Sequence, residues 1–118
     1  MLISNEVTLP YDRPKLSKAL SMSGAELALR PPGFYDSADI DVMLGSEVTK
    51  VDPNSKELEL DNGEKLKFTK LILATGSNPR KMDVEGGDLD NIFVVRTAKD
   101  ANAIAAAGKG KSVVIIGT

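Results

Sequence analysis

The sequence contains no cysteine, no histidine and no tryptophan in its 118 residues. Without thiols and imidazoles, the chain cannot form a Cys/His zinc site, a Cys-x-x-Cys redox pair, or a Ser-His or Cys-His catalytic pair. Any chemistry that this chain supports is therefore expected to reside in a bound organic cofactor, and no metal site is predicted. The lack of cysteine also suits a reducing compartment.

The sequence has no basic surplus and no long apolar run. Its 15 lysines and arginines are outnumbered by 17 acidic residues, and the only aromatic residues are three Phe and two Tyr. A nucleic-acid-binding module usually shows an excess of positive charge and stacking aromatics, so that class is excluded. The apolar runs are far shorter than the roughly 20 residues that span a bilayer, and no membrane insertion is expected.

The first forty residues predict one strand end and two short helices. Residues 2–4 are typical of the end of a strand. Pro14 suits the first turn of a helix, whose apolar face carries Leu16, Ala19 and Leu20 and which should end at Ser23-Gly24. A second short helix is predicted over residues 33–38, with Phe34 and Tyr35 as its buried positions.

From residue 41 the apolar pattern takes a period of two. It predicts strands at residues 42–44, 48–51, 57–60 and 65–68, with a hairpin turn at Asp61-Asn62-Gly63, where Asn and Gly accept positive φ. The alternating charged residues should form the solvated face of this antiparallel meander. They are Glu57, Glu59, Lys65 and Lys67.

The last third of the chain contains two continuous apolar runs, residues 71–74 and 113–116. Runs of this kind are typical of strands that are buried on both faces of a parallel sheet. A short strand is also predicted at residues 92–95, after a polar linker at 81–91. Thr97 and Asp100 then form a capping-box pattern that opens a helix ending at Gly108.

Three segments of the sequence together resemble a known enzyme family. They are LPYDRPKLSK at residues 9–18, LILATGSNPR at 71–80 and VVRTAKDA at 94–101, the last followed by the run that ends in Gly117. Their order and spacing resemble the FAD-dependent pyridine nucleotide-disulfide oxidoreductases of the ferredoxin-reductase and apoptosis-inducing-factor type, and most of all the apoptosis-inducing factor 3-like proteins.

The resemblance implies an α/β fold, namely a partial FAD/NAD(P)-binding, Rossmann-like domain with an inserted antiparallel β-meander. Residues 1–80 would be the central and C-terminal part of the FAD-binding domain, 81–91 a linker, and 92–118 the start of an NAD(P)-binding domain. The sequence contains no G-x-G-x-x-G. We therefore expect an internal fragment, with the FAD fingerprint upstream of it and the NAD(P) fingerprint beginning at Gly117.

The resemblance further implies that Arg13 contacts FAD and that Lys18, the candidate catalytic residue, lies near the isoalloxazine ring. Fixed cations at such positions favour the anionic reduced flavin. Pro14 would stiffen the loop against the flavin, although simple helix initiation also explains it. Judged from spacing alone, Arg13 and Lys18 are more typical of two solvated charges on a helix face, and it is the resemblance that favours the cofactor role.

Five further residues are expected at FAD through the same resemblance. The backbone of Val48 would meet the adenine ring, although ordinary strand core is an equally good explanation of this residue. The small residues Ala74, Thr75 and Gly76 follow a predicted strand end, where a cofactor can approach the backbone closely, although an ordinary turn has the same pattern. Arg80 would either border FAD or close the linker.

The predicted function is that of a flavoprotein fragment whose parent protein transfers electrons from NAD(P)H through FAD to an acceptor protein. The family implies an iron–sulfur protein as one such acceptor, and a cytoplasmic or mitochondrial location. The isolated fragment should be inactive. The alternative is a non-catalytic folded domain that acts as a scaffold or partner-binding module. A glycine-rich strand–turn–helix encoded on each side of the chain distinguishes the two hypotheses.

Overall fold

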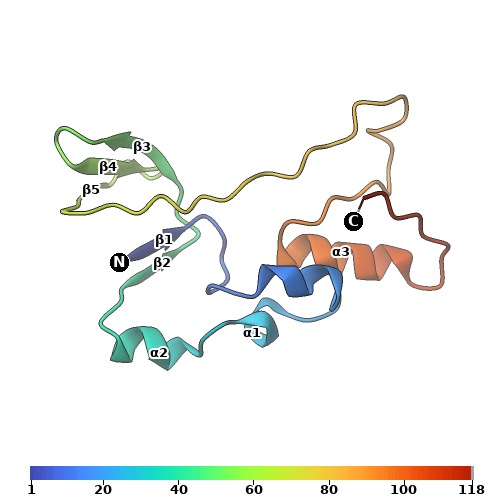
Figure 1. Ribbon diagram of the computed structural model, residues 1–118, viewed down its shortest axis with the longest axis horizontal. Helices are drawn as coiled ribbons and strands as arrows, with labels where there is room; N and C mark the ends of the chain where they lie inside the picture. Colours follow the sequence, from blue (N-terminus) through green and yellow to red (C-terminus); the bar gives the residue numbers. More distant parts are fainter. Residues whose placement is uncertain (118) are drawn as a thin grey trace. The chain divides into compact units, whose positions relative to one another are not determined.

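The computed structural model describes residues 1–117, which form two compact units (Figure 1). The first unit contains Met1–Tyr11 and Ala28–Gly76, and the second contains Asp12–Leu27 and the chain from Ser77 onward. Helices and strands are both present, and the predicted α/β class is confirmed. The domain ranges 1–80, 81–91 and 92–118 stay a prediction.

A parallel strand pair and a helix form one part of the first unit. Strand β1 (Leu2–Ser4) pairs with β2 (Val42–Leu44), in register from Leu2 opposite Val42 to Ser4 opposite Leu44. Parallel strands need a long connection between them. Here two stretches of the connection pair at an isolated antiparallel bridge between Tyr11 and Ala28. The connection then continues through helix α2 (Pro32–Ser37) to β2.

Helix α2 corrects one of the predicted core positions. Tyr35 is buried as expected, but Phe34 is 39% exposed. The Phe34 ring meets Tyr35 edge-on at 5.5 Å, and the Arg30 guanidinium lies 5.4 Å from the Phe34 ring centroid. Neighbouring positions of a helix point in different directions, so a helix of this length cannot bury both rings against one surface.

The predicted antiparallel meander is confirmed and forms the rest of the first unit. Strands β3 (Val48–Asp52), β4 (Glu57–Leu60) and β5 (Lys65–Lys67) pair in that order. Leu58 and Leu60 are buried on one face, while Lys65 and Glu57 form an ion pair at 3.3 Å on the other. The turn between β4 and β5 contains Gly63 at φ +84°. The alternation of hydrophobic and charged residues along β4 and β5 therefore determines which face of this sheet is exposed to solvent.

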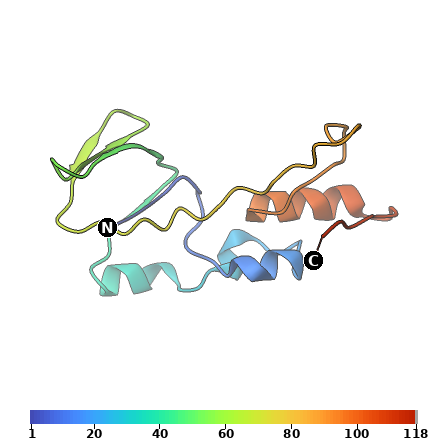
Figure 2. The ribbon, with the colours of Figure 1, turned by 45° about the horizontal axis from the view of Figure 1, so that its top comes forward.

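Three helical segments form the core of the second unit. The 3₁₀ helix η1 (Arg13–Ser17) packs against α3 (Ala98–Gly108), and the two lie side by side in Figures 1 and 2; α1 (Gly24–Leu27) belongs to the same unit. The buried residues of this unit are Leu16, Leu27, Ala98 and Ala101. None of the helices within residues 1–117 combines the length and apolar character that a membrane crossing demands.

The helix expected to end at Ser23-Gly24 is wrong in its extent. The helix ends at Ser17, and Gly24 instead begins α1. Ser23 and Glu26 account for the start of α1, because the Glu26 carboxylate accepts hydrogen bonds from the Ser23 backbone N–H at 2.8 Å and from its hydroxyl at 2.7 Å, while the Glu26 N–H donates to Ser23 Oγ at 3.3 Å. This reciprocal cap favours a new helix start at that point.

The three apolar strands predicted in the last third of the chain are also wrong for the described residues. Residues 71–74, 92–95 and 113–116 adopt no strand, and Ile72, Val114 and Ile115 are more than four-fifths exposed. A strand is stabilised by hydrogen bonds to a neighbour, and no other strand within residues 1–117 pairs with these runs. Thr118, the last residue of the predicted NAD(P)-binding segment 92–118, lies outside the described residues.

Candidate functional site

Helix η1 and its flanks carry three of the predicted site residues, Arg13, Pro14 and Lys18. Pro14 occupies the first turn, as predicted, and Lys18 caps the C-terminal end through its backbone N–H to the Lys15 carbonyl. Leu16, between the two cations, is 1% exposed and anchors the segment. The structure therefore brings these three residues together on one rigid turn.

Arg13 and Lys18, two of the three cations of this segment, differ in their surroundings. Arg13 is half-buried, whereas Lys18 is exposed and its ammonium group donates to the Pro14 carbonyl at 3.3 Å. Lys15, on the same turn, pairs with Asp12 at 3.3 Å. The Lys18 ammonium is thus the accessible cation, while Arg13 is held by the fold.

A polar network connects Arg13 to the start of α3. The Arg13 Nη1 atom donates to the backbone carbonyl of Arg96, which lies 83 residues further along the chain. On the other side of the same residue, the Arg96 backbone N–H donates to Asp100 Oδ2 at 3.1 Å. Thr97 completes the cap, because its backbone N–H donates to Asp100 Oδ2 at 2.8 Å and its Oγ1 accepts from the Asp100 N–H at 3.2 Å.

The charge of Asp100 is stabilised by this arrangement. Burial raises the pKa of Asp100, but hydrogen bonds from the backbone and side chain of Thr97 and from the Arg96 backbone outweigh burial and hold the pKa below its usual value, with a smaller contribution from Lys99. The carboxylate is therefore ionised at neutral pH, where a charge-assisted hydrogen bond is strong.

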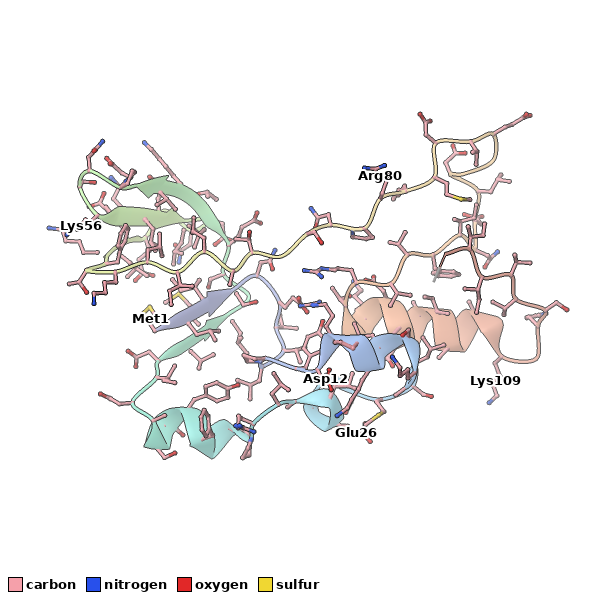
Figure 3. All side chains as sticks on the ribbon, in the orientation of Figure 1. Met1, Asp12, Glu26, Lys56, Arg80 and Lys109 are labelled. Carbon is pink, nitrogen blue, oxygen red and sulfur yellow. The ribbon has the colours of Figure 1, made fainter. Side chains whose placement is uncertain are left out.

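Arg80 belongs to the second unit, but it is not joined to the other predicted residues. It lies on an extended segment without regular structure, its side chain projects into solvent (Figure 3), and within residues 1–117 it forms no hydrogen bond or ion pair. Its two predicted roles, bordering FAD or closing the linker, stay predictions.

The other predicted residues belong to the first unit. Val48 begins β3 opposite Leu60 and is 37% exposed, so it is not the ordinary core residue that its pattern also allowed. Ala74, Thr75 and Gly76 are exposed on a segment without regular structure, and Gly76 takes φ +69°. The Gly76 conformation is one that residues with a side chain rarely adopt.

The sequence-based prediction of the site missed Arg96 and Asp100 as neighbours of Arg13. The Thr97–Asp100 capping box was predicted and is confirmed. No side-chain pattern could have revealed that the Arg96 carbonyl accepts from Arg13, since a backbone acceptor leaves no mark in the sequence.

The residues of the second unit suit an anionic organic ligand better than a metal. A guanidinium offers a planar fork of N–H donors and an ammonium offers three donors, both suited to phosphate or to a negatively charged ring edge. Among residues 1–117, no group of three or more acidic side chains could hold a metal ion. The cations of η1 and its C-cap can therefore interact with an anionic group.

Comparison with known proteins agrees with the resemblance drawn from the sequence. Apoptosis-inducing factor 3 of Homo sapiens is 41% identical over 109 residues, which are 92% of this chain and 18% of that protein. Rubredoxin-NAD(+) reductase of Pseudomonas putida is 37% identical over 120 residues, covering 98% of this chain and 31% of that protein.

Solved structures give the same result. The crystal structure of NADH:rubredoxin oxidoreductase from Clostridium acetobutylicum superposes with a TM-score of 0.81 and 33% identity, over 92% of this chain and 29% of that one. The chain thus spans less than a third of the length of the relatives that it matches. The family model of the pyridine nucleotide-disulphide oxidoreductases matches residues 1–118. The chain belongs to the pyridine nucleotide-disulphide oxidoreductase family.

Proposed function

We propose that this chain is part of a flavoprotein oxidoreductase that passes electrons from NAD(P)H through FAD to an acceptor protein, such as an iron–sulfur protein. The observation that carries the proposal is the family match along residues 1–118. The names of two relatives, a rubredoxin-NAD(+) reductase and an NADH:rubredoxin oxidoreductase, support a nicotinamide donor and a small redox protein as acceptor.

FAD, when bound, would supply the redox chemistry, so the residues of this chain need only bind and tune it. Arg13 would present a positive charge whose direction is set by its hydrogen bond to the Arg96 carbonyl. The exposed Lys18 would add a second positive charge, and Pro14 keeps the turn between them stiff. Fixed positive charges of this kind favour negative charge on a neighbouring group. Val48, Ala74, Thr75, Gly76 and Arg80 remain proposed FAD contacts.

The 118 residues alone should bind FAD weakly and be inactive. Pyrophosphate is usually held by a glycine-rich loop at a helix N-terminus, and this sequence contains no G-x-G-x-x-G. Retention of FAD by the purified 118-residue chain at a Kd of about 1 μM or tighter would contradict this part of the proposal. A cytoplasmic or mitochondrial location is also proposed, supported by the absence of cysteine.

The role of Lys18 is tested with Lys18→Ala in the full-length flavoprotein that contains this chain. Lys15→Ala is the matched control, because it removes the same charge from the same turn. A charged hydrogen bond contributes about 1.5–3 kcal/mol, so Lys18→Ala should weaken FAD binding or slow flavin reduction by roughly tenfold or more. Flavin spectra and reduction kinetics equal to those of Lys15→Ala would remove Lys18 from the site.

A further inference from the structure

The peptide between Arg96 and Thr97 is held from both sides. Its carbonyl, that of Arg96, accepts from the Arg13 guanidinium, and its N–H, that of Thr97, donates to the Asp100 carboxylate at 2.8 Å. Both side chains are half-buried, as is Arg96 itself. A backbone unit that is fixed at its N–H cannot turn its carbonyl freely, and the direction of that carbonyl in turn fixes the guanidinium.

Capping of α3 alone does not account for this arrangement. A capping box needs the hydrogen bonds between Asp100 and Thr97, at 2.8 and 3.2 Å. The bond from the Arg96 N–H is additional, because Arg96 precedes the N-cap residue Thr97. It holds the preceding peptide, between Val95 and Arg96, so that the Asp100 carboxylate fixes the backbone on both sides of the Arg96 Cα.

We infer that Asp100 is a positioning residue for Arg13: through the peptide between Arg96 and Thr97 it sets the direction of the guanidinium that faces FAD. The inference rests on the proposed function, since it requires Arg13 to contact FAD. Asp100 itself does not need to touch the cofactor. Its ionisation at neutral pH, which the hydrogen bonds favour, keeps the acceptor at full strength.

The test uses Asp100→Ala, Arg13→Ala and the double variant in the full-length flavoprotein, with FAD affinity, flavin absorption and flavin reduction potential as measurements. Asp100→Asn keeps the shape and one acceptor, and is the second variant if Asp100→Ala fails to fold. Glu26→Ala is the matched control. Glu26 is the acidic member of the reciprocal Ser23–Glu26 cap of α1 in the same unit, and its hydrogen bonds are made with Ser23.

If Asp100 acts through Arg13, Asp100→Ala should weaken FAD binding by about tenfold, which is about 1.4 kcal/mol, and should move the reduction potential in the same direction as Arg13→Ala. In the Arg13→Ala background it should have little further effect, because residues of one network are not additive. Glu26→Ala should leave FAD affinity and potential unchanged.

Two outcomes would overturn the inference. One is an equal effect of Asp100→Ala with and without Arg13. The other is an effect no larger than that of Glu26→Ala. Arg13→Ala with native FAD affinity and potential would instead refute the proposed Arg13–FAD contact, so the failure of the proposed site and the failure of the positioning role give different results.

Discussion

Replacing Leu16 with alanine should detach η1 from its anchorage in the second unit. Leu16 is 1% exposed and is the one buried residue of η1. The α3 face buried in the same unit is formed by Ala98 and Ala101, which are small and lie on a rigid helix. The surroundings have little capacity to close over a cavity, and buried Leu→Ala changes cost about 2–5 kcal/mol. We expect about 3 kcal/mol, a large share of the roughly 5–15 kcal/mol that stabilises a typical domain.

The measurement is the free energy of unfolding in denaturant, followed by helical circular dichroism, together with amide hydrogen exchange of α3. Leu29→Ala is the matched control, because it removes the same atoms from a side chain that is 54% exposed and should cost less than about 0.5 kcal/mol. Faster exchange across α3 in Leu16→Ala alone would support the packing of η1 on α3. Equal stability of the two variants would refute it.

Two further predictions concern pH and backbone geometry. Burial raises the pKa of Asp100, but hydrogen bonds from Thr97 and Arg96 lower it overall. The stability contributed by the carboxylate is therefore present above the unfolded pKa of about 3.9 and is lost as pH falls through the lower folded pKa. Hydrogen-exchange protection of α3 should decline with acidification in the native chain and not in Asp100→Asn. A Cβ at Gly87 would lie 2.5 Å from the Met82 carbonyl oxygen, so Gly87→Ala should lower the melting temperature. Gly33 lies in α2, and a Cβ there would meet no atom within 4 Å. Gly33→Ala should therefore leave the melting temperature unchanged or raise it, since alanine is favoured over glycine in a helix by roughly 1 kcal/mol. Equal melting temperatures for the two glycine variants would contradict the close approach at Gly87.

Local patterns predicted those parts of the fold that depend on nearby residues. The Asn62-Gly63 turn and the alternation around Leu58 and Leu60 were sufficient to predict the meander, and Thr97 with Asp100 predicted the start of α3. Each of these depends on interactions within a few residues or between adjacent strands. The Ser23–Glu26 cap is equally local, but a glycine such as Gly24 is also typical of a helix end, and that pattern gives the wrong boundary here.

Features that depend on distant partners could not be predicted in the same way. The apolar run at 113–116 indicates a buried strand, but burial also needs neighbouring strands, and in the described residues its side chains are 59–86% exposed. The role of Arg13 at FAD stays a prediction, like those of Pro14 and Lys18, and its backbone acceptor at Arg96 depends on a contact across 83 residues. The roles of Val48, Ala74, Thr75, Gly76 and Arg80 stay predictions.

The bridge between Tyr11 and Ala28 closes the segment between them, residues 12–27, into a loop. Its two ends are joined by Leu29 N–H to the Pro10 carbonyl at 2.9 Å and by Asp12 N–H to the Leu27 carbonyl at 3.1 Å. Because its ends already meet, residues 12–27 can be replaced as a cassette with little change in loop-closure entropy. Such a replacement would exchange Arg13, Lys15 and Lys18 together, provided that it keeps Leu16 and Leu27, which are buried in the second unit.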